Sequence, residues 1–178
     1  MCERFIVLKI ARKERMITIR NATENDIQPM LDIYNEIIAN TTAVFQYDPH
    51  TFDMRSEWLA QKQKENYPVF IAEENKEVIG FSTFGQFRNW QAYKYSVENS
   101  VYVRADQRGK GIGKLLLQPL IAVAKQMQLH TIIAGIVADN EASIALHKQF
   151  GFVEVAHFKQ VGYKFERWLD LKFLQLMI

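Results

Sequence analysis

The run VYVRADQRGKGIGKLL occupies residues 101–116. Its β-branched start at Val101–Val103 predicts a strand, and the apolar spacing that begins at Ile112 predicts a helix. The junction carries glycines at alternate positions: Gly109, Gly111 and Gly113. Glycine lets a backbone approach a ligand closely, and the first N–H groups of a helix have no partner within it. With the helix dipole, such a junction suits an anionic group such as a diphosphate.

Three cations, Arg108, Lys110 and Lys114, surround this junction and strengthen the prediction of an anion site. Two common phosphate motifs do not fit. The Walker pattern requires Ser or Thr where Leu115 stands, and the dinucleotide pattern requires glycine where Lys114 stands. What remains is the spacing Arg108-x-x-Gly111-x-Gly113.

Strand and helix patterns alternate along the rest of the chain, which predicts one α/β domain. Helical spacing covers residues 24–40, 53–65, 111–127 and 140–149. Strand-like runs cover residues 17–19, 69–72, 78–84, 95–103, 131–137, 153–159 and 169–177. Asn75-Lys76 predicts a hairpin turn, and Thr23 with Asp26 predicts a helix cap.

Composition narrows the class of protein. The 178 residues hold 22 Lys+Arg and 20 Asp+Glu, a net charge of +2, and a single cysteine, Cys2. Five basic and two acidic side chains lie in residues 1–15, so residues 16–178 carry a charge of −1. We therefore expect no nucleic-acid partner, no membrane span, no metal site and a cytoplasmic location. We expect residues 1–15 to be a disordered N-terminal extension and residues 16–178 to be the domain.

The spacing Arg108-x-x-Gly111-x-Gly113 resembles the acetyl-CoA motif of the GNAT superfamily of N-acetyltransferases. The strand at 132–137, Asn140 and a helix that ends in Gly-Phe at 151–152 follow in the order typical of that superfamily. Further stretches resemble its phosphinothricin and methionine sulfone/sulfoximine N-acetyltransferase branch: 33–36, 42–43, 67–69, 87–88, 97–103, 143–147 and 161–170. The chain departs from the branch at Gln86, Trp90 and Glu166.

This resemblance implies a single GNAT-like domain, a mixed central β-sheet flanked by helices, with acetyl-CoA at the start of the central helix. The implied acetyl-CoA-binding residues are Val101, Tyr102, Val103, Arg108, Gly109, Lys110, Gly111, Ile112, Gly113, Lys114 and Asn140. The implied substrate-binding residues are Arg88, Asn89, Trp90, Glu98, Asn99 and Ser100. Without the resemblance, Asn140 would be read as a simple N-cap and Arg88 as a solvated loop cation.

Two residues receive catalytic roles from the resemblance. Glu98 is the expected general base for the substrate amine, although an ordinary exposed strand glutamate fits the same pattern. His147 is the expected proton donor to the leaving thiolate, and a polar packing residue on a helix is an equal alternative.

The implied reaction moves an acetyl group from acetyl-CoA to the α-amine of a small amino acid analogue, by direct attack in a ternary complex. Phosphinothricin, methionine sulfone and methionine sulfoximine are the implied substrates, and the implied assembly is a homodimer. Two alternatives stay open. One is a protein N-terminal or lysine acetyltransferase of the same fold, and the other is a non-catalytic acyl-CoA-binding sensor.

Overall fold

A computed structural model describes residues 8–12 and 15–178, with side chains from Met16 onward. The chain forms two compact units, which are described separately. Unit 1 comprises the residues up to Tyr34, His50–Thr83 and Val101–Leu120. Unit 2 comprises Asn35–Pro49, Phe84–Ser100 and Ile121–Ile178.

Unit 1 is built on antiparallel strands in the order β1 (Leu8–Arg12), β2 (Arg15–Asn21), β3 (Val69–Glu74) and β4 (Glu77–Gln86). The last residues of β5 (Ser96–Val103) lie beside β4, where the amide of Arg104 donates to the carbonyl of Ile79. The predicted turn joins β3 to β4, because Asn75 and Lys76 both adopt the positive φ that a two-residue hairpin requires.

The N-terminal segment departs in part from the sequence expectation. Residues 8–12, which we expected to belong to a disordered extension, pair with β2 as the edge strand β1. The exposed hydrogen-bonding edge of β2 gives this segment a template for pairing. Residues 1–7 and 13–14 lie outside the described residues, so the domain boundary at residues 15–16 stays a prediction.

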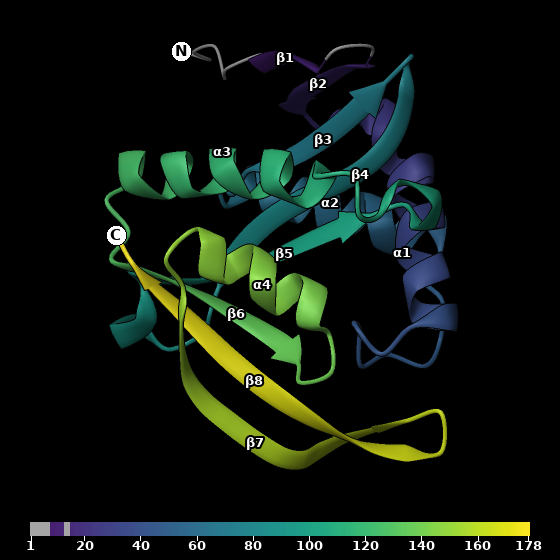
Figure 1. The fold of residues 1–178 in the computed structure, drawn as a ribbon. Coiled ribbons are helices and arrows are strands. Elements are labelled where there is room, and N and C mark those ends of the chain that lie inside the picture. Colours follow the sequence, from purple (N-terminus) through teal and green to yellow (C-terminus); the bar gives the residue numbers. More distant parts are fainter. Residues whose placement is uncertain (1–7, 13–14) are drawn as a thin grey trace. The chain divides into compact units, whose positions relative to one another are not determined.

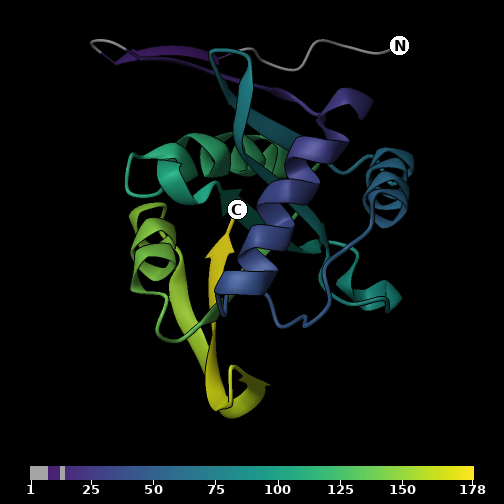
Figure 2. The same cartoon turned by 90° about the vertical axis from the view of Figure 1, so that its right-hand side faces the viewer.

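The helices of unit 1 begin close to where the sequence predicts. A capping box forms at Thr23, whose N–H and Oγ1 donate to the Asp26 carboxylate over 2.7 and 2.9 Å, and α1 (Ile27–Asn40) follows. The other two helices that unit 1 contains wholly or in part are α2 (Phe52–Lys64) and α3 (Ile112–Gln126). Figure 2 shows α2 beside the first turns of α1.

Unit 2 contains the parallel pairing that makes the sheet mixed, as predicted. Ser96–Glu98 of β5 pair in parallel with β6 (Thr131–Val137), and β8 (Arg167–Met177) lies antiparallel between β6 and β7 (Val153–Lys164). Helix α4 (Glu141–Gln149) packs on β6 (Figure 1). Strands β7 and β8 extend beyond the predicted ranges because they pair with each other up to a two-residue turn.

The conformation of that turn fits the glycine that the branch usually has at one position. Phe165 and Glu166 both adopt positive φ, 52° and 57°, which glycine adopts without steric cost. Glu166, where the branch usually has glycine, therefore occupies a position where a Cβ is disfavoured.

Lys164, 3% exposed, stands just before the turn and is buried without a carboxylate partner in the described part of unit 2. Its Nζ instead donates to three carbonyls at and after the end of α1, at 2.7–2.9 Å, those of Ile38, Thr41 and Val44. The ammonium thus satisfies carbonyls that the helix leaves without partners.

Candidate active site

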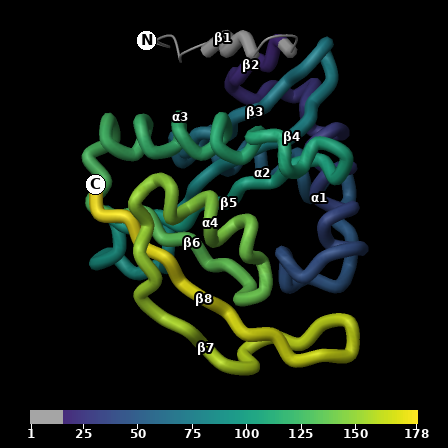
Figure 3. Tube along the Cα trace, viewed as in Figure 1, coloured from purple at the N-terminus to yellow at the C-terminus, as the bar shows by residue number. Residues whose placement is uncertain are grey.

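The predicted anion loop lies in unit 1, between the end of β5 and the start of α3. Figure 3 follows the chain from β5 through this loop into α3. Gly109 and Gly111 have φ of 74° and 83°, a conformation that other residues rarely adopt. Ile112, 1% exposed, anchors the first helical turn in the core. The N–H groups of that turn lack partners within α3, so the loop presents donors that an anion would satisfy.

The cations of the loop lie at the surface around these donors. Arg108, Lys110 and Lys114 are exposed. The Arg108 Nε donates to the carbonyl of Val103 over 3.1 Å, and the Lys110 Nζ donates to the Gln107 side chain over 3.3 Å. These contacts keep positive charge beside the helix N-terminus while the lysine ammonium groups retain further donors.

Tyr102, on the adjacent end of β5, is supported by an aromatic cluster that the sequence analysis missed. Its ring lies 5.3 Å from that of Tyr34 and 4.9 Å from that of Phe81. The guanidinium of Arg55, 2% exposed, lies 4.1 Å from the centre of the Tyr34 ring. A cation buried among aromatic rings is stabilised by their π faces. No local pattern reveals Arg55, because it sits on a helix of weak amphipathicity.

The close approach of β4 to the same strand depends on Gly80. A Cβ at Gly80 would lie 2.7 Å from the carbonyl oxygen of Tyr102. A side chain there would push against the β5 backbone, so this glycine sets the position of the predicted acetyl-CoA-binding strand.

In unit 2, the pairing of β5 with β6 stops early. The register ends at Glu98–Ile133, although β5 continues to Val103 and β6 to Val137. Main-chain groups of Asn99 and Ser100 on that side therefore lie outside the β5–β6 ladder. An unpaired strand edge of this kind can bind an extended chain that carries amide groups.

Glu98 stands at this end of the ladder, half-buried. A Cβ at Gly135 of β6 would lie 2.8 Å from the Glu98 Oε1, so the carboxylate rests directly over this glycine. Burial raises the pKa of Glu98, and the positive charge of Arg88 opposes that rise. A carboxylate with a raised pKa in a partly enclosed position is suited to accepting a proton near neutral pH.

Gly135 is a site residue that sequence analysis missed, although a signal existed. It is an isolated glycine within the strand TIIAGIV at 131–137. A lone glycine inside a strand often marks a close approach of another group.

Asn99 and His147 meet on the other side of β5. The Asn99 Nδ2 lies 3.0 Å from the His147 Nε2, and the His147 Nδ1 lies 2.8 Å from the carbonyl oxygen of Ser143. The two side chains are 6% and 3% exposed. Successive strand residues point to opposite faces, so Asn99 lies on the face opposite Glu98 and Ser100. Its predicted substrate contact stays a prediction that this burial does not support.

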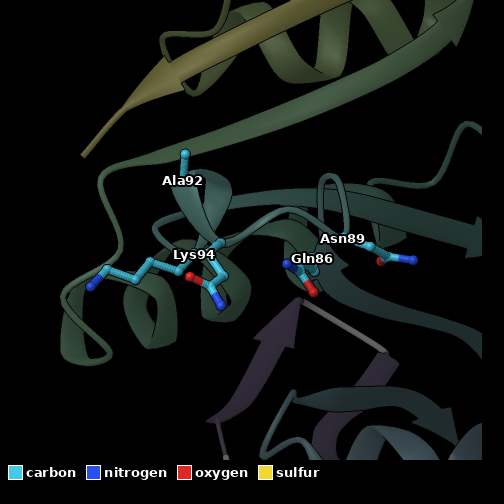
Figure 4. Close-up of a pocket in the computed structure, with 5 residues that line it drawn as sticks. Gln86, Asn89, Ala92 and Lys94 are labelled. Atoms are coloured by element: carbon cyan, nitrogen blue, oxygen red, sulfur yellow. The ribbon is translucent and has the colours of Figure 1, made fainter.

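The predicted substrate-binding residues of the β4–β5 connection are exposed. Arg88 stacks its guanidinium 4.1 Å from the centre of the Phe87 ring, and Trp90, 74% exposed, stacks with Tyr93. Asn89 is one of the residues that line a hollow of about 550 Å³, together with Gln86, Gln91, Ala92 and Lys94 (Figure 4). Arg88 and Trp90 do not line this hollow, so the three neighbours are not gathered in one pocket.

Asn140 caps α4. Its Oδ1 accepts a hydrogen bond from the N–H of Ser143 over 3.1 Å, which is the N-cap role that the sequence also allowed. Its predicted contact with acetyl-CoA stays a prediction. In the described parts of the chain, no three His, Cys, Asp or Glu side chains gather to hold a metal ion, and no helix has the length and apolar character needed to cross a membrane.

Comparison with known proteins identifies the family in which this glycine-rich loop follows this strand. The GNAT acetyltransferase domain model matches residues 19–172, a range that runs through both units. An L-methionine sulfoximine/L-methionine sulfone acetyltransferase of Pseudomonas paraeruginosa is 42% identical, over 89% of this chain and 93% of the relative. A phosphinothricin N-acetyltransferase of Streptomyces coelicolor is 36% identical, over 87% and 92%.

One similar protein has been solved with its cofactor bound. The acetyltransferase YncA of Salmonella typhimurium, solved with its cofactor acetyl-CoA, superimposes with a TM-score of 0.89 and 42% identity, over 90% of this chain and 93% of that one. The predicted fold class and enzyme class are therefore confirmed, and the chain belongs to the GNAT acetyltransferase family.

Proposed function

We propose that this protein uses acetyl-CoA to acetylate the α-amine of a small amino acid analogue: methionine sulfone, methionine sulfoximine or phosphinothricin. The observation that carries the proposal is the half-buried Glu98, which lies on the same strand as the predicted acetyl-CoA-binding residues Val101, Tyr102 and Val103. The positive charge of Arg88 lowers the pKa of this carboxyl, against the effect of burial. The relatives named above act on such analogues, which supports the choice of substrate.

The residues of unit 1 fit acetyl-CoA. The left-handed glycines and the α3 N-terminus offer backbone donors to the diphosphate, and Arg108, Lys110 and Lys114 offer charge. The end of β5 offers main-chain groups to the amides of the pantetheine arm. Acetyl-CoA supplies a thioester carbonyl that an amine can attack.

Glu98 would serve as the base. The substrate enters mostly as an ammonium ion, so its nitrogen must lose a proton before it can attack. The Glu98 carboxylate accepts that proton, directly or through a water molecule. A nitrogen–carbon bond then forms and the carbon–sulfur bond breaks. Of the two protons that leave the nitrogen in the overall reaction, one ends on the CoA sulfur and the other reaches solvent.

Arg88 would bind the carboxylate of the amino acid. A guanidinium presents paired N–H donors that match the two carboxylate oxygens. Asn89 and Trp90 lie next to it in sequence and would contact the polar head of the analogue. Trp90 replaces the aromatic that the branch commonly has, so it would influence which analogue is preferred.

We also propose that the protein is a cytoplasmic homodimer. The single cysteine suits a reducing compartment. Strands β7 and β8 expose a row of apolar side chains that water-exposed monomers rarely keep: Val153, Val155, Phe158, Val161, Tyr163, Phe165 and Trp168. Light scattering during size-exclusion chromatography should give twice the 20.8 kDa chain mass, and a monomeric mass would contradict the dimer.

A panel assay of thiol release from acetyl-CoA tests the function. We expect turnover with at least one of the three analogues and little with ordinary amino acids. Peptides with a free N-terminus or a lysine side chain belong in the same panel, because turnover confined to them would establish the protein acetyltransferase instead. Acetyl-CoA binding without turnover of any amine would establish the sensor.

A pair of matched variants tests the base. Glu98→Gln should lower kcat by about 100-fold or more while acetyl-CoA still binds, since general-base catalysis contributes on that order. Glu154→Gln is the control, because Glu154 on β7 is paired with Lys172 on β8 and is not a predicted site residue. Equal rates for wild type and Glu98→Gln would remove Glu98 from the reaction.

A further inference from the structure

The contacts of His147 define its protonation. The carbonyl oxygen of Ser143 can only accept a hydrogen bond, so the His147 Nδ1, 2.8 Å away, must carry the hydrogen. The Nε2 of a neutral imidazole is then an acceptor, and it faces the Asn99 Nδ2 donor at 3.0 Å. With the Asn99 amide in this orientation both ring nitrogens are used, and the imidazole is neutral.

This arrangement is poorly suited to proton donation. A donor would need a hydrogen on Nε2, and that hydrogen would point at the two hydrogens of the Asn99 amide. An amide side chain cannot pass the proton on, because it neither accepts nor releases one near neutral pH. Burial also lowers the pKa of His147, against the opposing effect of the Ser143 carbonyl. The neighbours that the structure gives the ring, Asn99, Ser143 and Phe152, carry no charge.

We propose that Asn99 and His147 form a positioning pair that holds β5 where its pairing with β6 ends and thereby aims the Glu98 carboxylate. The proposal rests on the proposed function, because it assigns Glu98 the role of base. It replaces proton donation by His147 with a structural task that acts on catalysis through Glu98.

The location of the pair supports this role. The β5–β6 register ends at Glu98–Ile133, so Asn99 is the first residue of β5 beyond that ladder. Its side-chain hydrogen bond to α4 fixes the strand one residue past the last paired position. Because side chains alternate along a strand, rotation of β5 at Asn99 would swing Glu98 on the opposite face.

Helix α4 holds the His147 side of the pair in place. The carbonyl of His147 accepts hydrogen bonds from the N–H groups of Phe150 and Phe152, over 3.0 and 3.2 Å. The Phe152 ring packs edge-on against the imidazole, with 5.0 Å between ring centres. The imidazole is therefore held from its own helix end as well as by Ser143, and it presents Nε2 to Asn99 on β5.

The Asn99 Oδ1 depends on the same amide orientation. This atom is buried and has no hydrogen-bond partner among the described residues. A buried amide oxygen without a donor is costly, so this orientation is favoured only while the imidazole is neutral and its Nε2 accepts from Nδ2. A turned amide would satisfy Oδ1 only with a protonated His147.

Two substitutions at His147 separate positioning from proton donation. His147→Gln keeps a side-chain oxygen that can accept from the Asn99 amide but cannot donate a proton as an acid. His147→Phe keeps the ring shape and removes the acceptor. For a positioning pair, we expect His147→Phe to lower kcat by roughly 10- to 100-fold, since a displacement near 1 Å costs on that order, and His147→Gln to restore most of that loss.

The pH profile and the Michaelis constants complete the test. Both variants should keep the shape of the wild-type kcat profile, and the KM for acetyl-CoA should change less than kcat. Equal large losses in both variants, with disappearance of an alkaline limb, would overturn the proposal and establish His147 as the acid. His157→Gln, at an exposed histidine paired with Asp170, is the matched control and should behave as wild type.

A double-variant cycle tests coupling within the pair. Asn99→Leu should lower kcat about as much as His147→Phe, and the combination should cost no more than either alone, because each single change already breaks the same contact. Additive losses would contradict the pair. Thermal unfolding of each variant confirms that the protein measured is folded.

One readout does not depend on activity. The ¹⁵N chemical shifts of His147 should report a neutral ring with hydrogen on Nδ1 across pH 6–8, and Asn99→Leu should alter the Nε2 shift. A ring that carries hydrogen on Nε2 at neutral pH would overturn the proposal. Absence of turnover with every amine would instead overturn the proposed function while these shifts still decide the pair.

Discussion

Gly135→Ala should slow the reaction while leaving the fold intact. The added Cβ would lie 2.8 Å from the Glu98 Oε1 and 3.3 Å from the Phe173 Cε1. Ordinary contact begins near 3.4 Å, so the carboxylate must move by about 0.6 Å. The flexible end of a glutamate side chain can make that movement at little cost in stability.

The effect on catalysis is larger than the effect on stability. A 1 Å misplacement of a catalytic group costs about 100-fold, so a movement of about 0.6 Å predicts a kcat lower by roughly 10- to 20-fold. The free energy of unfolding should change by less than about 1 kcal/mol, because the loss of glycine flexibility in the unfolded chain offsets the crowding. That change corresponds to a Tm shift of no more than about 2–4 °C.

Steady-state thiol release gives kcat and both KM values, and differential scanning fluorimetry gives Tm. The decisive comparison adds Gly135→Ala to Glu98→Gln, where the base has already been removed. If Gly135 acts through Glu98, the second change should lower kcat less than twofold further. The reasoning would be refuted by an unchanged kcat in the single variant, or by the full 10- to 20-fold loss in the Glu98→Gln background.

Three further predictions follow from other contacts. Lys164→Met should lower the free energy of unfolding in urea by about 2–4 kcal/mol, because three carbonyls lose their donor. Lys159→Met, which removes an exposed ion pair, is the control and should lower it by less than about 1 kcal/mol. Equal losses would contradict a stabilising role for the Lys164 hydrogen bonds. Glu166→Gly should raise Tm, with a gain of up to about 1 kcal/mol from relief of the positive φ, and a lower Tm would show that the turn is unstrained. Arg88→Gln should move the acid limb of the kcat/KM profile to higher pH. Glu98 must be ionised to act as the base, and its pKa rises when the positive charge of Arg88 is lost. An unmoved acid limb would contradict the interaction between Arg88 and Glu98.

Local sequence patterns predicted the elements well. Helical spacing placed α3 within one residue at each end, at Ile112–Gln126, and the turn residues Asn75-Lys76 placed the first hairpin. These features depend on contacts between residues that are close in the chain, so a short window contains the information. The last hairpin ran longer than predicted because its strand ends are stabilised by pairing with each other.

The same patterns could not show which side chains meet. Arg55 contacts Tyr34 from another helix, and Lys164 reaches carbonyls more than 100 residues away. The alternation of strand residues already implied that Glu98 and Asn99 face apart, yet the family resemblance grouped them as one wall of a substrate site. The structure separates them, because His147 on α4 holds Asn99 on the other face.

The sequence by itself determined the glycine-rich junction after β5, its cations and the resemblance to the GNAT family, since these depend on residue types at short, fixed spacings. The tertiary structure alone decided that Gly135 makes room for the Glu98 carboxylate and that His147 has both nitrogens engaged. The physical reason is that a side chain's protonation and aim depend on the partners that folding brings to it: Gly135 lies 37 residues from Glu98, and Asn99 lies 48 residues from His147.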